Sequence, residues 1–260
     1  MTILDKIIQN KIKEVNAKKA LFPISLLEKS KAFTRTPSSL AAALRNSNTG
    51  IIAEHKRRSP SKSVINDQVN LPGVVTGYSK AGVCGISVLT DTKYFGGSLD
   101  DLALARNCAD IPLLRKEFII DSYQIYEAKA YGADAILLIA ASLNDNQLKE
   151  FSKTAKKLGL DVLLEVHNEE ELQRSLLPTV DMLGVNNRNL KTFDVSIDIS
   201  KALSEKIPKD FVKISESGIS DAETIKTLRK YGYKGFLIGE TFMKTDNPGE
   251  SANQFIDQLR

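Results

Sequence analysis

Short apolar runs recur along most of this chain, and stretches of helical period separate them. The apolar runs are Ile51–Ala53, Gly85–Leu89, Ile111–Leu114, Ala135–Ile139, Val162–Leu164, Met182–Val185, Phe211–Ile214 and Gly235–Ile238. Short apolar runs bounded by polar residues are typical of strands that are buried on both faces. The intervening stretches favour amphipathic helices at Ser122–Tyr131, Asn146–Leu158, Glu169–Leu176 and Asp221–Tyr231.

The ends of these helices carry their own signals. Asp121 or Ser122, Asn144, and Ser220 or Asp221 are credible N-caps, because their short polar side chains can accept hydrogen bonds from the first turn. Gly132, Gly159 and Gly232 stand where helices should end.

The segment before Ile51 has a different pattern. Ile3, Leu4, Ile7, Ile8, Ile12 and Val15 recur at helical spacing, and Lys6, Lys11, Lys13, Lys18 and Lys19 are assigned to the opposite face. This predicts an amphipathic helix packed on the outside of the domain, with a membrane-surface helix as the alternative. Two shorter helices are expected near Ser25–Lys31 and Ser38–Arg45.

Eight strand–helix units predict a (β/α)8 barrel, a fold of about 250 residues. A doubly wound parallel sheet is the alternative, but no G-x-G-x-x-G or Walker A sequence follows any expected strand. No Pro- or Ser-rich linker divides the chain. We therefore expect one domain, with residues 1–48 as an N-terminal helical extension and residues 49–260 as the barrel.

Composition narrows the class of protein further. The 260 residues carry 36 basic and 32 acidic side chains, for a net charge of +4, and no long basic tract indicates nucleic-acid binding. The two cysteines lack metal-like spacing, which favours reduced thiols. No apolar run approaches the ~20 residues of a membrane span. The N-terminus is not expected to be a signal peptide, and it is a poor match to a transit peptide. We expect a cytoplasmic protein with no nucleic-acid or membrane partner, as a monomer or weak homodimer.

The stretch from Ile51 to Ser61 is the most informative in the chain. Three apolar residues lead directly into Glu54 and Lys56, which lie two apart and so share a face of the strand. Ser59 follows in the loop. In a barrel, the carboxyl ends of the strands carry the active site. This arrangement therefore predicts a site for a charged ligand.

Other expected strands end in the same way. Lys116, Glu165, Asn186 and Ser217 each follow an apolar run and are expected to point inward, as Glu54 does. Lysines and glutamates around one mouth can shift each other's pKa values. A lysine that is desolvated or near other cations can act as an acid, and a glutamate in an apolar surround can act as a base.

A phosphate site is expected at the last two strands. Barrels often bind phosphate through the loops after strands seven and eight. Here Ser217-Gly218-Ile219 and Gly239-Glu240-Thr241 have small residues whose backbone N–H groups can approach an anion, and Ser59 can contribute from the first loop. Glu240 is expected to face the phosphate with its backbone and not with its carboxylate. Tight turns are the alternative explanation for these glycines.

Taken together, these motifs resemble the indole-3-glycerol phosphate synthase family over nearly the whole chain. The resemblance rests on six segments in order: Ile-Ala-Glu54-His-Lys56-Arg-Arg-Ser59-Pro-Ser61, Leu-Arg-Lys116-Glu-Phe118, Leu-Leu-Glu165-Val-His, Gly-Val-Asn186-Asn-Arg188-Asn-Leu190, Ser-Glu216-Ser217-Gly218-Ile219 and Leu-Ile-Gly239-Glu240. One departure is visible, because family members usually have Gly where this chain has Ser63. That puts the backbone path of the first loop in doubt.

The resemblance implies a substrate, a reaction and roles for the residues. The substrate is a phosphorylated small molecule, 1-(2-carboxyphenylamino)-1-deoxyribulose 5-phosphate, which closes to indole-3-glycerol phosphate with loss of CO2 and water, without cofactor or metal. Lys116 resembles the general acid, Glu165 the base or proton shuttle, and Lys56 the group that binds the carboxylate. Glu54 and Asn186 are expected to orient substrate and lysines, with Arg188 and Ser217 in binding. Phe95, Phe118, Leu137 and Leu190 are expected to enclose the aromatic ring.

Two alternatives remain at this point. Another phosphate-binding barrel, either a sugar-phosphate isomerase or an aldolase with a lysine Schiff base, is compatible with Lys116 at a strand end. A catalytically inactive binding barrel predicts missing acid or base residues, yet Glu54, Lys56, Lys116, Glu165 and Asn186 are all present.

Overall fold

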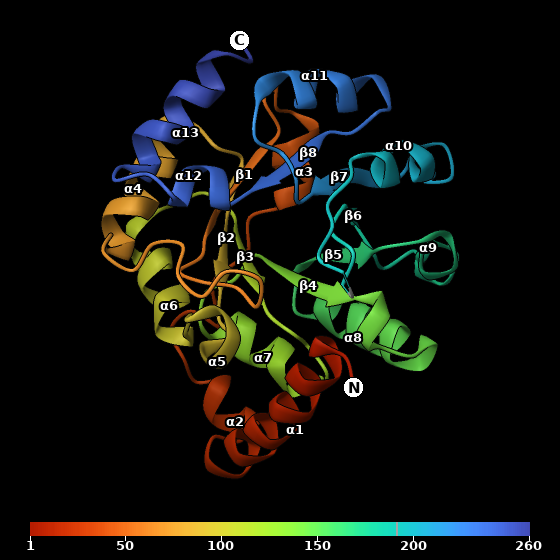
Figure 1. Ribbon diagram of the computed structural model, residues 1–260. Helices are drawn as coiled ribbons and strands as arrows, with labels where there is room; N and C mark the ends of the chain where they lie inside the picture. The colour runs from red at the N-terminus through yellow and green to blue at the C-terminus, as the bar shows by residue number, and fades with distance from the viewer. Residues whose placement is uncertain (191) are drawn as a thin grey trace.

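Eight parallel strands close into a barrel in the computed structural model, which describes residues 1–190 and 192–260 (Figure 1). The strands follow chain order: β1 (Ile51–His55), β2 (Gly85–Leu89), β3 (Leu113–Lys116), β4 (Ala135–Ile139), β5 (Asp161–Val166), β6 (Met182–Asn186), β7 (Val212–Glu216) and β8 (Gly235–Ile238). Parallel pairing of β1 with β8 completes the circle. The predicted (β/α)8 barrel is confirmed.

Several strands extend further toward the carboxyl end than the apolar runs predicted. β3 ends at Lys116 and not at Leu114, β5 continues through Glu165, and β7 includes Glu216. These polar residues take part in the sheet, where Leu89 pairs with Lys116 and Ile139 with Glu165. The charged side chains therefore project from strands, which hold them more rigidly than loops would.

Helices surround the barrel and precede it. They are α1 (Ile3–Leu21), α2 (Ile24–Leu27), α3 (Leu40–Arg45), α4 (Leu71–Ala81), α5 (Thr92–Phe95), α6 (Leu99–Cys108), α7 (Tyr123–Ala130), the 3-10 turn η1 (Ala140–Ser142), α8 (Asp145–Lys157), α9 (Glu169–Ser175), α10 (Asp198–Ser204), α11 (Ala222–Lys230), α12 (Glu240–Met243) and α13 (Pro248–Asp257). Within residues 1–190 and 192–260, no helix is long and apolar enough to cross a membrane.

The predicted caps are mostly confirmed. The side chains of Asn144 and Asp221 accept hydrogen bonds from the first turns of α8 and α11. At the start of α7, Ser122 makes no side-chain bond, but Oδ1 of Asp121, the other candidate, accepts from the backbone N–H of Tyr123 at 2.8 Å. Gly132, Gly159 and Gly232 follow these three helices with positive φ. The predicted helix at Ser25–Lys31 is only the short α2, because turns begin at Glu28.

The core has two layers. Inside the barrel, Ile52, Leu163 and Ile214 are fully buried, and α3 contributes Leu40, Ala41 and Leu44 to the same cluster. Leu40 approaches Gly85 at the start of β2, so α3 closes the amino end of the barrel. The outer layer joins the strands to the surrounding helices. The carboxyl end is thus left as the open face.

Helix α1 lies against the carboxyl side of the barrel, near α5 and α7 (Figure 1). The assignment of Lys11 to the polar face was wrong, since Lys11 is buried in line with Ile7 and Val15. Its ammonium contacts Glu14 at 2.9 Å, Asp91 at 3.0 Å and Glu117 at 3.1 Å. A buried lysine is tolerated where carboxylates surround it, so these ion pairs fix α1 to the ends of β2 and β3.

Candidate active site

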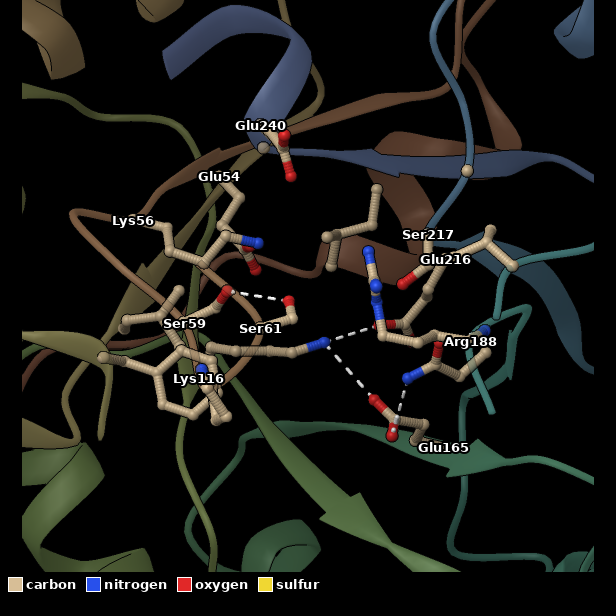
Figure 2. Close-up of a pocket in the computed structure, with 18 of the residues that line it drawn as sticks. Glu54, Lys56, Ser59, Ser61, Lys116, Glu165, Arg188, Glu216, Ser217 and Glu240 are labelled. Atoms are coloured by element: carbon tan, nitrogen blue, oxygen red, sulfur yellow. Dashed lines mark hydrogen bonds and ion pairs between the residues drawn. The ribbon is translucent and has the colours of Figure 1, made fainter. Parts of the chain in front are cut away.

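A cavity of about 400 Å³ opens at the carboxyl ends of the strands. Every site residue predicted from the sequence lies in its lining. The charged and polar candidates are Glu54, Lys56, Lys116, Glu165, Asn186 and Ser217, and the remaining candidates are Ser59, Phe95, Phe118, Leu137, Arg188, Leu190, Gly218, Gly239 and Glu240. Residues more than one hundred positions apart are thus brought together at one mouth (Figure 2).

Lys116 occupies the centre of this site. It follows Leu114 of the inner core by two residues on β3, so its side chain points into the barrel mouth. Its ammonium lies 2.5 Å from Oε2 of Glu216 and 3.4 Å from Oε2 of Glu165 (Figure 2). Burial would lower the pKa of Lys116, but Glu216, Glu165 and Glu54 outweigh it and raise that pKa. The lysine is therefore protonated at neutral pH because of carboxylates, not made acidic by neighbouring cations as the sequence suggested.

Glu165 reaches the same centre from β5. Its Oε1 accepts a hydrogen bond from Nδ2 of Asn186 at 3.1 Å. The amide of Asn186 is oriented in turn, because the backbone N–H of Arg188 donates to its Oδ1 at 3.0 Å. Burial would raise the pKa of Glu165, but Lys116 and His167 outweigh it and lower that pKa. The expectation of a glutamate whose basicity comes from an apolar surround is wrong for this residue, which has charged neighbours.

Glu216 is the principal site residue that the sequence analysis missed. It is 1% exposed, and burial together with the charge of Glu165 raises its pKa to about 7. Val212, Ile214 and Glu216 alternate with Lys213 and Ser215, so strict strand parity would have placed this carboxylate inward. Room for it comes from Gly184 of β6, where a Cβ would lie 2.3 Å from Oε1 of Glu216.

Glu54 and Lys56 form the wall opposite. Nζ of Lys56 lies 2.7 Å from Oε1 of Glu54, and the Ser87 hydroxyl donates to Oε2 of Glu54 at 3.1 Å. Burial would raise the pKa of Glu54, but Lys56 and Lys116 outweigh it and lower that pKa. Gly239 lets this carboxylate approach β8, since a Cβ there would lie 2.8 Å from Oε1 of Glu54.

Two turns of small residues adjoin this wall, at the ends of β7 and β8. Ser217 and Gly218 both have positive φ, at 68° and 76°. Nδ2 of Asn187, which is fully buried, donates to the Ser217 carbonyl at 3.0 Å and fixes that turn. The hydroxyl of Thr241 donates to the Ile219 carbonyl at 3.0 Å, which joins the two turns. Ser217 thus reaches the cavity through its left-handed turn and not through strand parity.

The first loop follows β1, which neighbours β8 in the sheet. The backbone of Ser59 pairs with that of Lys62 in a tight turn, and the Ser59 and Ser61 hydroxyls are 3.2 Å apart (Figure 2). In the described chain, the non-glycine residues with positive φ are Phe193 and Ser217, so Ser63 adopts a conformation open to any residue. Lys62 pairs with the Glu240 carboxylate at 3.0 Å on the exposed rim.

Apolar side chains form the remaining wall. The rings of Phe95 and Phe118 are tilted by 43° with centroids 5.9 Å apart, and Leu137 and Leu190 also line the cavity. The sequence analysis missed the contribution of α1, which provides Ile3, Leu4 and Ile7. Nothing in the helical pattern alone indicates that this helix borders the mouth. An apolar wall with two aromatic rings, beside paired charges, suits an aromatic ring that carries an anionic group.

A barrel with three buried carboxylates, two lysines and an adjacent pair of small-residue turns defines an enzyme that moves protons on an anionic small molecule. The family model for indole-3-glycerol phosphate synthase matches residues 4–255. The chain belongs to this family of carboxy-lyases of tryptophan biosynthesis, and its activity is that of an indole-3-glycerol-phosphate synthase.

Related chains match over almost their full length. The indole-3-glycerol phosphate synthase of Bacteroides thetaiotaomicron is 48% identical over 99% of both chains. That of Salinibacter ruber is 43% identical over 98% of this chain and 95% of its own. Among solved structures, thiamine phosphate pyrophosphorylase from Pyrococcus furiosus superposes with a TM-score of 0.60 at 14% identity, covering 83% of this chain and 98% of that one. This last likeness is one of fold alone.

Proposed function

We propose that this cavity closes the indole ring of 1-(2-carboxyphenylamino)-1-deoxyribulose 5-phosphate by general acid–base catalysis, with Lys116 as the acid and Glu165 as the base. The observation that carries the proposal is the position of the Lys116 ammonium. It lies between the carboxylates of Glu216 and Glu165, at the centre of a cavity that also has an apolar wall. A protonated donor and an ionised acceptor therefore stand side by side.

Ring closure uses Lys116 as the proton donor. The aromatic carbon that carries the carboxylate attacks the ketone carbon of the sugar chain, and Lys116 gives a proton to the ketone oxygen, which becomes a hydroxyl. Loss of CO2 then leaves its electron pair in the ring and restores aromaticity. Glu216, with its pKa raised to about 7, is hydrogen-bonded to Lys116 and can share or return a proton.

Dehydration uses Glu165 as the proton acceptor. Glu165 takes the proton of the ring nitrogen as the new hydroxyl leaves, and Lys56 protonates that hydroxyl so that it departs as water. Glu165 then returns that proton to the nitrogen and takes one from the adjacent methylene carbon, and the C=C bond that forms completes the indole. Glu165 and Lys116 are 3.4 Å apart, which lets the base return its proton to the acid between turnovers. Lys56 recovers its proton from solvent, since its side chain is 20% exposed.

Three parts of the cavity are assigned to the phosphate, the aromatic ring and the carboxylate of the substrate. The phosphate is assigned to the turns at Ser217-Gly218 and Gly239-Glu240, with a contribution from Ser59 of the first loop, because backbone N–H groups in such turns bind anions. The aromatic ring lies among Phe95, Phe118, Leu137 and Leu190. Lys56 faces the carboxylate, Arg188 helps to bind and position the substrate, and Glu54 and Asn186 orient the lysines and the hydroxyls.

Product fluorescence tests these roles. Indole-3-glycerol phosphate should form from the carboxyphenylamino substrate with wild-type enzyme, and Lys116→Met should reduce kcat by about 10²–10⁴-fold, the usual contribution of a general acid. Lys230→Met, on the exposed side of α11, is the matched control and should leave kcat unchanged. Turnover by Lys116→Met at the wild-type rate would refute the role of Lys116.

We also infer that the enzyme works in the cytoplasm as a monomer or weak homodimer. The cavity lies at the mouth of a single barrel, so we expect each chain to be active on its own. Sedimentation over a hundredfold range of protein concentration, with activity measured per chain, tests the oligomeric state. Specific activity that falls on dilution would contradict it.

A further inference from the structure

His167 has a defined environment that the proposed chemistry does not use. It follows Glu165 by two residues, just beyond the end of β5, and its side chain is 11% exposed. It is not among the described residues that line the cavity, so it does not touch the substrate. Instead its ring lies between two carboxylates: Nε2 is 3.4 Å from Oε1 of Glu165, and Nδ1 is 3.1 Å from Oε2 of Glu171.

Glu171 is held on its far side. It belongs to the first turn of α9, where its backbone N–H donates to the side chain of the N-cap Asn168 at 2.9 Å. Nδ2 of Asn168 donates to Oε1 of Glu171 at 2.9 Å, and the backbone N–H of His167 donates to Oε2 at 2.8 Å. Both oxygens of Glu171 are thus engaged, and the carboxylate fixes the imidazole through Nδ1.

The two oxygens of Glu165 have different neighbours as a result. Oε1 accepts from Asn186 and lies against His167, while Oε2 faces Lys116 at 3.4 Å. A carboxylate held at one oxygen has its rotation restricted, which leaves the other oxygen in one position for proton transfer. The buried Nε2 of His167 makes no hydrogen bond among the described residues, so its contact with Oε1 of Glu165 is the ion pair at 3.4 Å.

We propose that His167 is a positioning residue for this reaction: Glu171 holds its imidazole, the imidazole holds Oε1 of Glu165, and Oε2 of Glu165 alone exchanges the proton with the substrate. The inference rests on the proposed role of Glu165 as base. His167 keeps its own protons throughout, so the route of proton transfer runs through Glu165 and Lys116 only.

The charges around the ring support this role. The groups that face His167 are Glu165 of β5, Glu171 of α9 and, at longer range, Glu216 of β7. Burial would lower the pKa of His167, but these carboxylates outweigh it and raise that pKa. With the ring protonated, Nδ1 donates to Glu171, Nε2 forms an ion pair with Glu165, and the positive charge lowers the pKa of Glu165. Removing that charge should raise the pKa of Glu165, which moves the acid limb of the kcat–pH profile to higher pH.

Two variants separate the two contacts of the ring. The amide of His167→Gln can occupy the place of Nε2 and reach Glu165, whereas that of His167→Asn can occupy the place of Nδ1 and reach only Glu171. His167→Asn should lower kcat by up to about 10²-fold, since a catalytic group misplaced by about 1 Å can lose that much, while KM should stay nearly unchanged. His167→Gln should retain more of kcat. Both should move the acid limb upward.

The outcomes distinguish this inference from the proposal on which it depends. Glu165→Gln tests the base itself: if it turns over like wild type, the proposed function fails whatever the histidine variants do. If Glu165→Gln is inactive but both histidine variants keep the wild-type kcat and acid limb, only the role of His167 is overturned. Lower stability in urea with an unchanged acid limb would show a merely structural histidine and would also overturn the inference.

Discussion

Oε2 of Glu216 lies 2.5 Å from Nζ of Lys116, a contact between strands β7 and β3 made by residues 100 positions apart. The two strands are not neighbours in the sheet, so the contact crosses the barrel mouth. It joins a lysine whose pKa is raised by carboxylates to a glutamate whose pKa is raised to about 7. A proton is therefore available at the centre of the cavity over the neutral pH range.

Glu216 should make stability depend on pH. Its pKa rises from 4.5 to about 7 on folding, so the folded protein binds more protons than the unfolded chain within that window. The free energy of unfolding therefore falls as pH rises from about 5 to 8, by on the order of 2 kcal/mol from this group. Glu216→Gln should flatten the decline, as measured by urea unfolding at several pH values.

The control for this measurement is Glu223→Gln, at an exposed position on α11. It should reproduce the wild-type pH dependence. An equally steep decline in Glu216→Gln would mean that the raised pKa belongs to another group.

Lys11 should hold helix α1 over the site. Substitution of Lys11 by Met leaves Asp91 and Glu117 buried without their shared cation, and breaking a buried ion pair at one partner typically costs about 3–5 kcal/mol. Because Ile3, Leu4 and Ile7 of the same helix line the cavity, KM should rise as well. Urea unfolding and steady-state kinetics measure the two effects.

Lys13→Met is the matched control, since Lys13 is exposed on the same helix. Its free energy of unfolding should stay within about 0.5 kcal/mol of wild type. Equal effects of the two substitutions would show that the buried ion pairs do not fix α1.

Glu240 should oppose the substrate phosphate unless Lys62 neutralises it. Their ion pair is exposed, so it adds only about 0–1 kcal/mol to stability, but it lies beside the proposed phosphate turns. Glu240→Gln should lower KM by a few-fold and Lys62→Ala should raise it, both less so at high ionic strength. A KM that responds to neither substitution would place the phosphate elsewhere.

Much of the site could be predicted because barrel strands impose a strict alternation. Glu54, Lys116 and Glu165 each follow an inner-core residue by two positions, and Asn186 follows the inner-core Met182 by four. The parity that buries Ile52, Leu114 and Leu163 therefore turns these side chains into the mouth. The turns after β7 and β8 could be predicted for a different reason. Their small residues allow the backbone N–H groups to approach an anion closely.

The remainder depended on tertiary contacts that a sequence does not display. The ends of β3 and β5 were placed too early because charged residues there pair in the sheet despite their polarity. Lys11 was assigned to the wrong face, since only the docked Asp91 and Glu117 make its burial favourable. Strand alternation alone would have placed Glu216 inward. The sequence analysis chose Ser217 instead, which also lines the cavity but reaches it through a left-handed turn.

The order of the two proton transfers is the central claim, and it can be measured in one experiment. Substrate labelled in the carboxylate should be mixed with enzyme, and CO2 release and indole fluorescence followed together. Lys116→Met should release no CO2 on the time scale of a wild-type turnover. Glu165→Gln should release one equivalent of CO2 per site without a matching rise in indole fluorescence. Equal loss of both signals in Glu165→Gln would contradict the assignment of Glu165 to dehydration.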